Sequence, residues 1–143
     1  GAGNCLSQIV SVAGSVRLTG VTTPMRGVTF NSLKSVGGDF IVTGCNGNFW
    51  NFDVMKLETI GGSLVLSDNA RFNGLGGFEA LKSVGGDLTV TGNGTSEGGI
   101  PVVSTSNKVG LDLLGKLYRD GVFADGAVFT IESGGVTYKI DEL

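Results

Sequence analysis

"LKSVGGDF" at residues 33–40 and "LKSVGGDL" at residues 81–88 differ in one letter and lie 48 positions apart. A related phrase, "LETIGGSL", begins midway between them at residue 57, and "IVSVAGSV" begins one step of 24 earlier, at residue 9. A strict internal period of this length is the sequence mark of a repeat architecture. Aligned without gaps, the four repeats run over residues 9–20, 33–44, 57–68 and 81–92.

Each repeat holds a pair of small residues followed by alternating apolar residues. The pair is Ala13-Gly14 in the first repeat and Gly-Gly in the other three. Apolar residues then stand two apart, as at Leu64 and Leu66, which is typical of a strand with one buried face. Glycines before a strand suit a tight bend that needs a positive φ or a close backbone approach. The sequence therefore predicts a mainly β fold, a parallel β-solenoid of four 24-residue coils.

The third and fourth repeats end in a further signature. Residues 64–69 (LVLSDN) and 88–93 (LTVTGN) match the L-x-L-x-x-N/C pattern of leucine-rich repeats. We expect the asparagine to turn inward and satisfy buried backbone groups of the neighbouring coil. Cys45 holds this position in the second repeat and Val21 in the first, so the ladder is expected to begin late.

The whole chain, residues 1–143, is expected to form one domain. Residues 1–8 are an N-terminal cap, 9–93 the solenoid, and 94–143 a C-terminal cap made of a loop, a helix and a hairpin. The helix is predicted within residues 107–121, capped by Ser106 or Asn107, with Leu113, Leu114, Leu117 and Tyr118 on one face and Gly121 at its end. Alternation on both sides of residues 133–135 predicts the hairpin. Both should hide the open strand edge of the last coil.

Composition and missing residue types exclude several functions. With a net charge of −3 and no basic cluster, we expect no nucleic-acid partner, and no apolar run suits membrane insertion. The sequence has no histidine, which removes the common nucleophile systems and metal ligand, so we predict no catalysis, metal or cofactor. Asp39 and Asp87 share a column, and we interpret them as acceptors of backbone N–H groups at the bend rather than a glycosidase pair.

The sequence leaves open whether the chain has a disulfide bond and whether it carries an N-linked glycan. Cys5 and Cys45 are either a disulfide that closes the N-terminal end of the stack or, at Cys45, a free buried ladder thiol. Asn93-Gly94-Thr95 is an N-glycosylation sequon, but an inward ladder side chain at Asn93 would be unavailable for a glycan.

The outward strand face is the candidate contact surface. It is expected to carry Arg17, Ile41, Val65 and Thr89, and adjacent exposed β-branched residues suit contact with a partner. Alternatively, these residues simply suit strands, or the C-terminal segment covers them. Trp50, in the aromatic stretch between the second and third repeats, is either an exposed anchor for a protein or sugar, or part of the core.

The phrases "LKSVGGDFIVTGC", "LETIGGSLVLSDN" and "LKSVGGDLTVTGN" resemble the receptor L-domain family, over about residues 5–95. These are short leucine-rich-repeat-like β-helices of receptor ectodomains and fungal cell-wall glycoproteins. The resemblance implies an extracellular or cell-surface setting and a non-catalytic role. We therefore expect a binding or adhesion module for a protein or glycan. The alternative is a structural subunit that assembles with copies of itself into a filament or layer.

Overall fold

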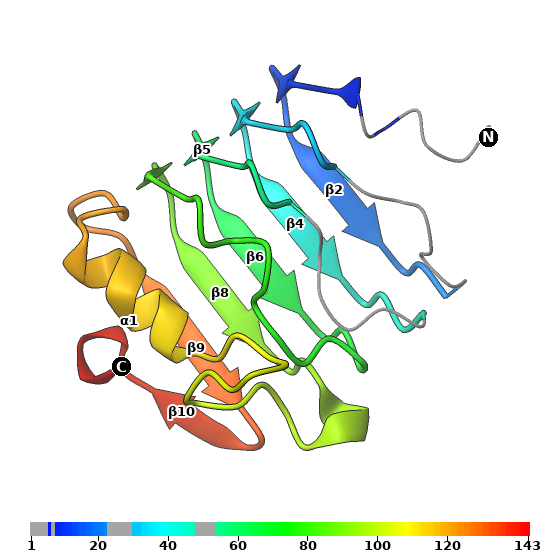
Figure 1. The fold of residues 1–143 in the computed structure, drawn as a ribbon, viewed down its shortest axis with the longest axis vertical. Coiled ribbons are helices and arrows are strands. Elements are labelled where there is room, and N and C mark those ends of the chain that lie inside the picture. The colour runs from blue at the N-terminus through cyan, green and yellow to red at the C-terminus, as the bar shows by residue number, and fades with distance from the viewer. Residues whose placement is uncertain (1–5, 7, 23–29, 48–53) are drawn as a thin grey trace.

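The computed structural model describes residues 6, 8–22, 30–47 and 54–143 (Figure 1). This part of the chain is mainly β, with parallel sheets and one α-helix. One sheet contains four strands of two residues each, β1 (Ser11–Val12), β3 (Ser35–Val36), β5 (Thr59–Ile60) and β7 (Ser83–Val84). The other runs in the order β10 (Val136–Tyr138), β9 (Phe129–Ser133), β8 (Leu88–Thr91), β6 (Leu64–Ser67), β4 (Phe40–Thr43) and β2 (Val16–Thr19).

Equivalent strands of successive repeats, 24 residues apart, pair in parallel. Val65 on β6, for example, lies between Ile41 on β4 and Thr89 on β8. The same register holds in the sheet of short strands, where Ile60 pairs with Val36 and Val84. The predicted parallel pairing at this period is confirmed.

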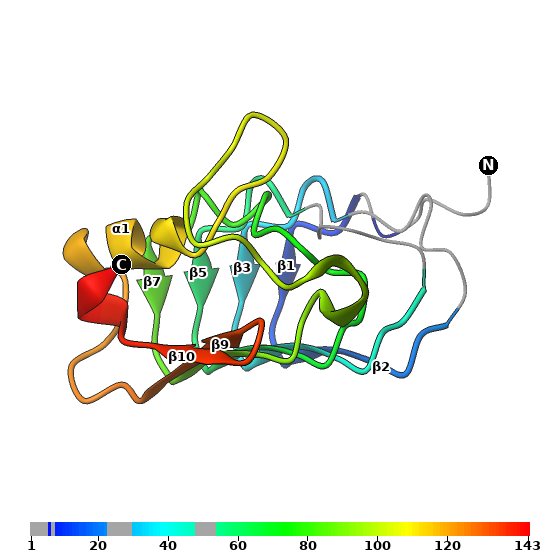
Figure 2. The same cartoon turned by 90° about the horizontal axis from the view of Figure 1, so that it is seen from below.

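The glycine pairs lie where the chain passes from one sheet to the other. Figure 2 shows the four short strands running down at a steep angle to the six-stranded sheet. Gly61 donates to the carbonyl of Val36 at 2.8 Å, and a Cβ on Gly61 would overlap the carbonyl oxygen of Gly37. Of the two requirements expected from the sequence, close backbone approach therefore explains these glycines, because none of the pairs has a positive φ.

Positive φ is required instead after the long strands. The residues at this position have φ between 57° and 65°, and they are Gly20, Gly44, Asp68 and Gly92. This left-handed conformation favours glycine because it has no Cβ. The residue in this conformation directly follows each long strand, and the residue after it carries the inward-pointing side chain of the asparagine ladder.

A single hydrophobic core fills the space between the sheets and the returning chain. The strands contribute the apolar columns expected from the sequence, such as Val36, Ile60 and Val84, which are buried. The returning segments add Phe30, Val54 and Phe78, which are also buried and lie 24 residues apart. Sequence reasoning missed this column, although extending the alignment three residues upstream of each repeat would have found it.

The C-terminal segment covers the open edges of the fourth repeat. β9 pairs in parallel with β8, and Phe123 forms a bridge with Val84 on β7. β9 and β10 form the predicted hairpin, whose two-residue turn, Gly134-Gly135, has positive φ at both positions, as a type I′ turn requires. β9 therefore covers the open edge of β8, as predicted for the hairpin, whereas α1 pairs with neither strand edge.

The helix α1 (Asp112–Arg119) begins later than the sequence predicted. Neither Ser106 nor Asn107 caps it, because the chain before α1 is tied to a preceding loop, with Leu111 donating to the carbonyl of Pro101 at 2.8 Å. Its end agrees with prediction: Gly121 (φ 78°) and Val122 donate to the carbonyls of Tyr118 and Leu117, which is a Schellman cap.

The predicted apolar face of α1 is correct for its leucines only. Leu113, Leu114 and Leu117 are buried, whereas Tyr118 is 41% exposed. In the described C-terminal part of the chain, residues Thr95–Glu97 (η2) and Ile140–Glu142 (η3) form short 3-10 helices. Within the described residues, no helix has the length and apolar character that crossing a bilayer requires.

Candidate functional site

The corner between the two sheets carries a ladder of side-chain oxygens that accept backbone N–H groups one repeat ahead. Ser15 Oγ accepts from Asp39 (2.9 Å), Asp39 Oδ1 from Ser63 (2.7 Å), Ser63 Oγ from Asp87 (3.0 Å) and Asp87 Oδ1 from Val128 (2.9 Å). The interpretation of the two aspartates as backbone acceptors is confirmed. Val128 belongs to the C-terminal segment, so the last bond also helps to attach it.

A second ladder lies at the far end of the long strands, inside the core. Asn69 is 0% exposed; its Oδ1 accepts from the Cys45 N–H (3.0 Å), and its Nδ2 donates to the Val42 carbonyl (3.0 Å) and to Asn93 Oδ1 (2.9 Å). Asn93 repeats the pattern by donating to the Leu66 carbonyl at 2.8 Å. The expected inward asparagine ladder is confirmed.

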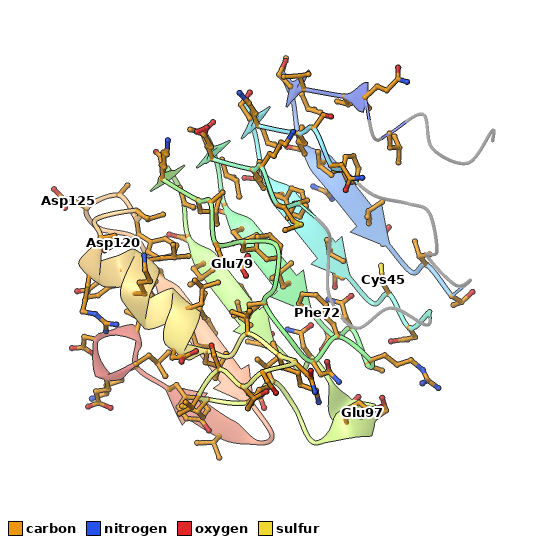
Figure 3. The ribbon with its side chains drawn as sticks, viewed as in Figure 1. Cys45, Phe72, Glu79, Glu97, Asp120 and Asp125 are labelled. Atoms are coloured by element: carbon orange, nitrogen blue, oxygen red, sulfur yellow. The ribbon has the colours of Figure 1, made fainter. Side chains whose placement is uncertain are left out.

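Cys45 occupies the first rung of this ladder, just beyond the carboxyl end of β4 (Figure 3). Its side chain is buried, and its thiol lies 3.6 Å from the carbonyl oxygens of Leu18 and Thr43. It is a free thiol within the described residues. Cys5 lies outside them, so the Cys5–Cys45 disulfide stays a prediction.

Asn93 is part of the ladder rather than an exposed glycan acceptor. Its side chain is 2% exposed, and the amide nitrogen that a glycan would occupy donates to Leu66. The alternative of a ladder role is therefore the one that fits the folded chain. A glycan at this nitrogen would have to displace a buried hydrogen bond.

The predicted contact surface lies together on the outer side of the six-stranded sheet. Arg17, Ile41, Val65 and Thr89 pair directly in register across β2, β4, β6 and β8. The row continues to Thr130 on β9. Arg17 is exposed, and the three residues that follow it are partly exposed.

A second outward row runs beside the first, two residues further along each strand. It consists of Thr19, Thr43, Ser67 and Thr91 in register. Ser67 donates to the hydroxyl of Thr43 at 2.9 Å, so neighbouring hydroxyls in this row are held at a fixed spacing. The surface formed by the two rows, which we call the outer face, thus combines an apolar centre with a line of hydroxyl groups.

The C-terminal segment does not cover the outer face. It adds β9 and β10 to the edge of the sheet, and α1 lies on the opposite, inner side (Figure 2). No helix or strand of the described chain lies over the outer side in that view. One of the alternative explanations for Ile41 and Val65 is therefore wrong. Trp50, the other predicted contact residue, lies outside the described residues.

Several acidic side chains of the described chain take part in structural hydrogen bonds, as Asp39, Asp87 and Asp112 do. Within the described part of the chain, no group of three or more acidic, cysteine or histidine side chains is placed to hold a metal ion. Burial acts to raise the pKa of Asp112, but hydrogen bonds from Ser104 and backbone groups outweigh it, and the pKa lies below its ordinary value. Ser104 donates to both carboxylate oxygens, at 2.6 and 2.9 Å, which closes the loop before α1.

Comparison with known proteins gives no relative: no protein-family model, no curated protein and no solved structure matches this chain.

Proposed function

We propose that this chain is a non-catalytic, extracellular binding module of the leucine-rich-repeat-like, β-solenoid type that receptor L-domains represent. In this proposal the four repeats are the coils of the solenoid, and the outer face is the contact surface. Ile41 and Val65 form its apolar centre, flanked by Arg17 and Thr89. The observation that carries the proposal is that this flat row of β-branched side chains is left uncovered by the described chain.

The chemistry of the outer face favours a protein partner over a glycan. Its outward positions hold aliphatic, hydroxyl and charged side chains, and no aromatic ring stands at any outward position of the paired strands β2, β4, β6 and β8. A flat aliphatic centre rimmed by polar groups matches the usual anatomy of a protein interface. A glycan would be the partner only through residues elsewhere.

The test is a photo-crosslinking experiment at the surface of the source cell. A photoreactive residue placed at Thr89 should capture a discrete protein, and the same residue at Val103, a 67% exposed position on a loop, should not. Purified partner should then bind the native chain, and Ile41→Asp should weaken binding at least about tenfold because it places a charge in the apolar centre.

Val103→Asp is the matched control, since it adds the same charge to an exposed valine away from the sheet. Circular dichroism and thermal unfolding establish that both variants are folded. The proposal fails if Thr89 and Val103 capture the same proteins, or if Ile41→Asp binds the purified partner as tightly as Val103→Asp does.

A self-assembling subunit is the second candidate, and the exposed state of the first repeat favours it. Val12 and Leu18 are only partly buried, whereas their counterparts Val36 and Val42 are 2% and 1% exposed. No described strand pairs with the far side of β2. Light scattering and electron microscopy of purified protein decide: a concentration-dependent filament would support assembly, and a stable monomer would exclude it.

A further inference from the structure

The strand β10 forms one edge of the six-stranded sheet, and no other described strand pairs with its outward backbone groups. Val136 and Tyr138 lie opposite Ser133 and Ile131 on β9. In an antiparallel pair that closes on a two-residue turn, these residues direct their N–H and C=O groups toward the partner strand. Thr137, between them, therefore directs its N–H and C=O groups away from β9. Thr137 is also exposed.

The usable part of this edge is short. The N–H of Lys139 points outward by the same alternation, but its carbonyl accepts from the N–H of Glu142 at 3.0 Å, where η3 begins. At the other end, the Gly134-Gly135 turn closes the hairpin. The edge thus offers three backbone groups, the N–H and C=O of Thr137 and the N–H of Lys139, and no described strand lies beside them.

A hollow of 390 Å³ adjoins the same strand. Its lining comes from Tyr118 on α1, Phe129 on β9, residues 137–139 and the start of η3. Tyr118 and Phe129 pack edge to face with centroids 5.6 Å apart, which fixes one wall. Tyr118 is 41% exposed and Val136 51% exposed, so apolar and aromatic surface is available beside the free backbone groups.

We propose that β10 binds a short extended segment of a partner protein, which adds to the sheet as a seventh strand and places one apolar side chain in this hollow. Strand addition to a sheet edge draws affinity from main-chain hydrogen bonds and specificity from pockets that receive alternate side chains. Both parts occur here on one strand, because Thr137 supplies the hydrogen bonds and Tyr138 lines the hollow.

The geometry favours a peptide segment over a second copy of this chain. A second copy would offer its own β10, whose Tyr138 already lines its own hollow and is not free to enter another. An edge with three usable backbone groups and a lysine also resists open-ended strand pairing. A short segment with one anchor side chain needs no more than this edge provides.

The proposal is tested by selecting a random library of displayed nine-residue linear peptides on the intact protein. The expected result is a set of peptides that share one large apolar residue and alternate around it. Thr137→Pro should weaken their binding about tenfold or more, because it removes the outward N–H and blocks strand addition. The β9–β10 pairing does not use that N–H, and the strand before it is already extended, so the variant should fold.

A second variant and a direct measurement keep the test decisive. Tyr118→Ala should lower affinity most for peptides with the largest anchor, and amide hydrogen exchange should slow at Thr137 and Lys139 when a peptide binds. Val103→Asp should bind as the native chain does. The proposal is overturned if no peptide is enriched, if binding leaves those two amides unprotected, or if the native chain is a dimer that Thr137→Pro dissociates.

Discussion

In the third and fourth repeats, a side-chain oxygen accepts a backbone N–H group at each end of the long strand, once at the surface and once in the core. At the corner between the sheets, Ser63 accepts the N–H of Asp87 one repeat ahead, at the exposed surface. At the far end of the long strand, Asn69 accepts the N–H of Cys45 one repeat behind, in the core. Water can replace the first bond when its acceptor is removed, but it cannot reach the second. We therefore expect the buried hydrogen bond of Asn69 to contribute more to the stability of the fold than the exposed hydrogen bond of Ser63.

The largest effect is expected from Asn69→Ala. It leaves the Cys45 N–H without its acceptor in the core and removes the donor to the Val42 carbonyl and to Asn93 Oδ1. One buried N–H without a partner, together with the loss of three buried hydrogen bonds, should lower the free energy of unfolding by about 4 kcal/mol. Chemical denaturation measures the change. The matched control is Asn46→Ala, since Asn46 is exposed and, among the described residues, its side chain accepts only the Ala70 N–H; this variant should cost less than about 1 kcal/mol.

An intermediate effect is expected where a glycine makes the exposed corner possible. In Gly61→Ala the new methyl group would overlap the carbonyl oxygen of Gly37, so the backbone of one repeat must shift, at about 2–3 kcal/mol. The control is Gly14→Ala in the first repeat, where a Cβ meets open space and no positive φ is required. Thermal unfolding should separate the two variants clearly; equal melting temperatures would show that close stacking does not explain the glycine pairs.

The smallest effect is expected from Ser63→Ala at the exposed rung. The Asp87 N–H loses its acceptor, but water can take that place, so the loss should be under about 1 kcal/mol. The same denaturation series measures it. A loss as large as that of Asn69→Ala would mean that exposure does not distinguish the two corners.

The sequence predicts most of what recurs, although the column of Phe30, Val54 and Phe78 was missed, and it is less exact where the chain does not repeat. The strands, the register and the asparagine ladder follow from the period, because each column must meet the same neighbour in the next repeat. The start of α1 does not follow, because it depends on a bond between Leu111 and Pro101 that no local pattern announces. The outer face was predicted as a row, but only the structure places α1 on the other side of the sheet.

The glycine contacts and the rungs described above each reach one repeat and no further. Each of these contacts depends only on the adjacent repeat and not on the total number of repeats. In a chain lengthened by a second copy of residues 57–80, each new strand would have a parallel neighbour on both sides, and β9 would still pair with β8 of the last repeat. A single duplication can therefore lengthen this architecture by one unit of 24 residues while the C-terminal segment keeps its pairing with the last repeat.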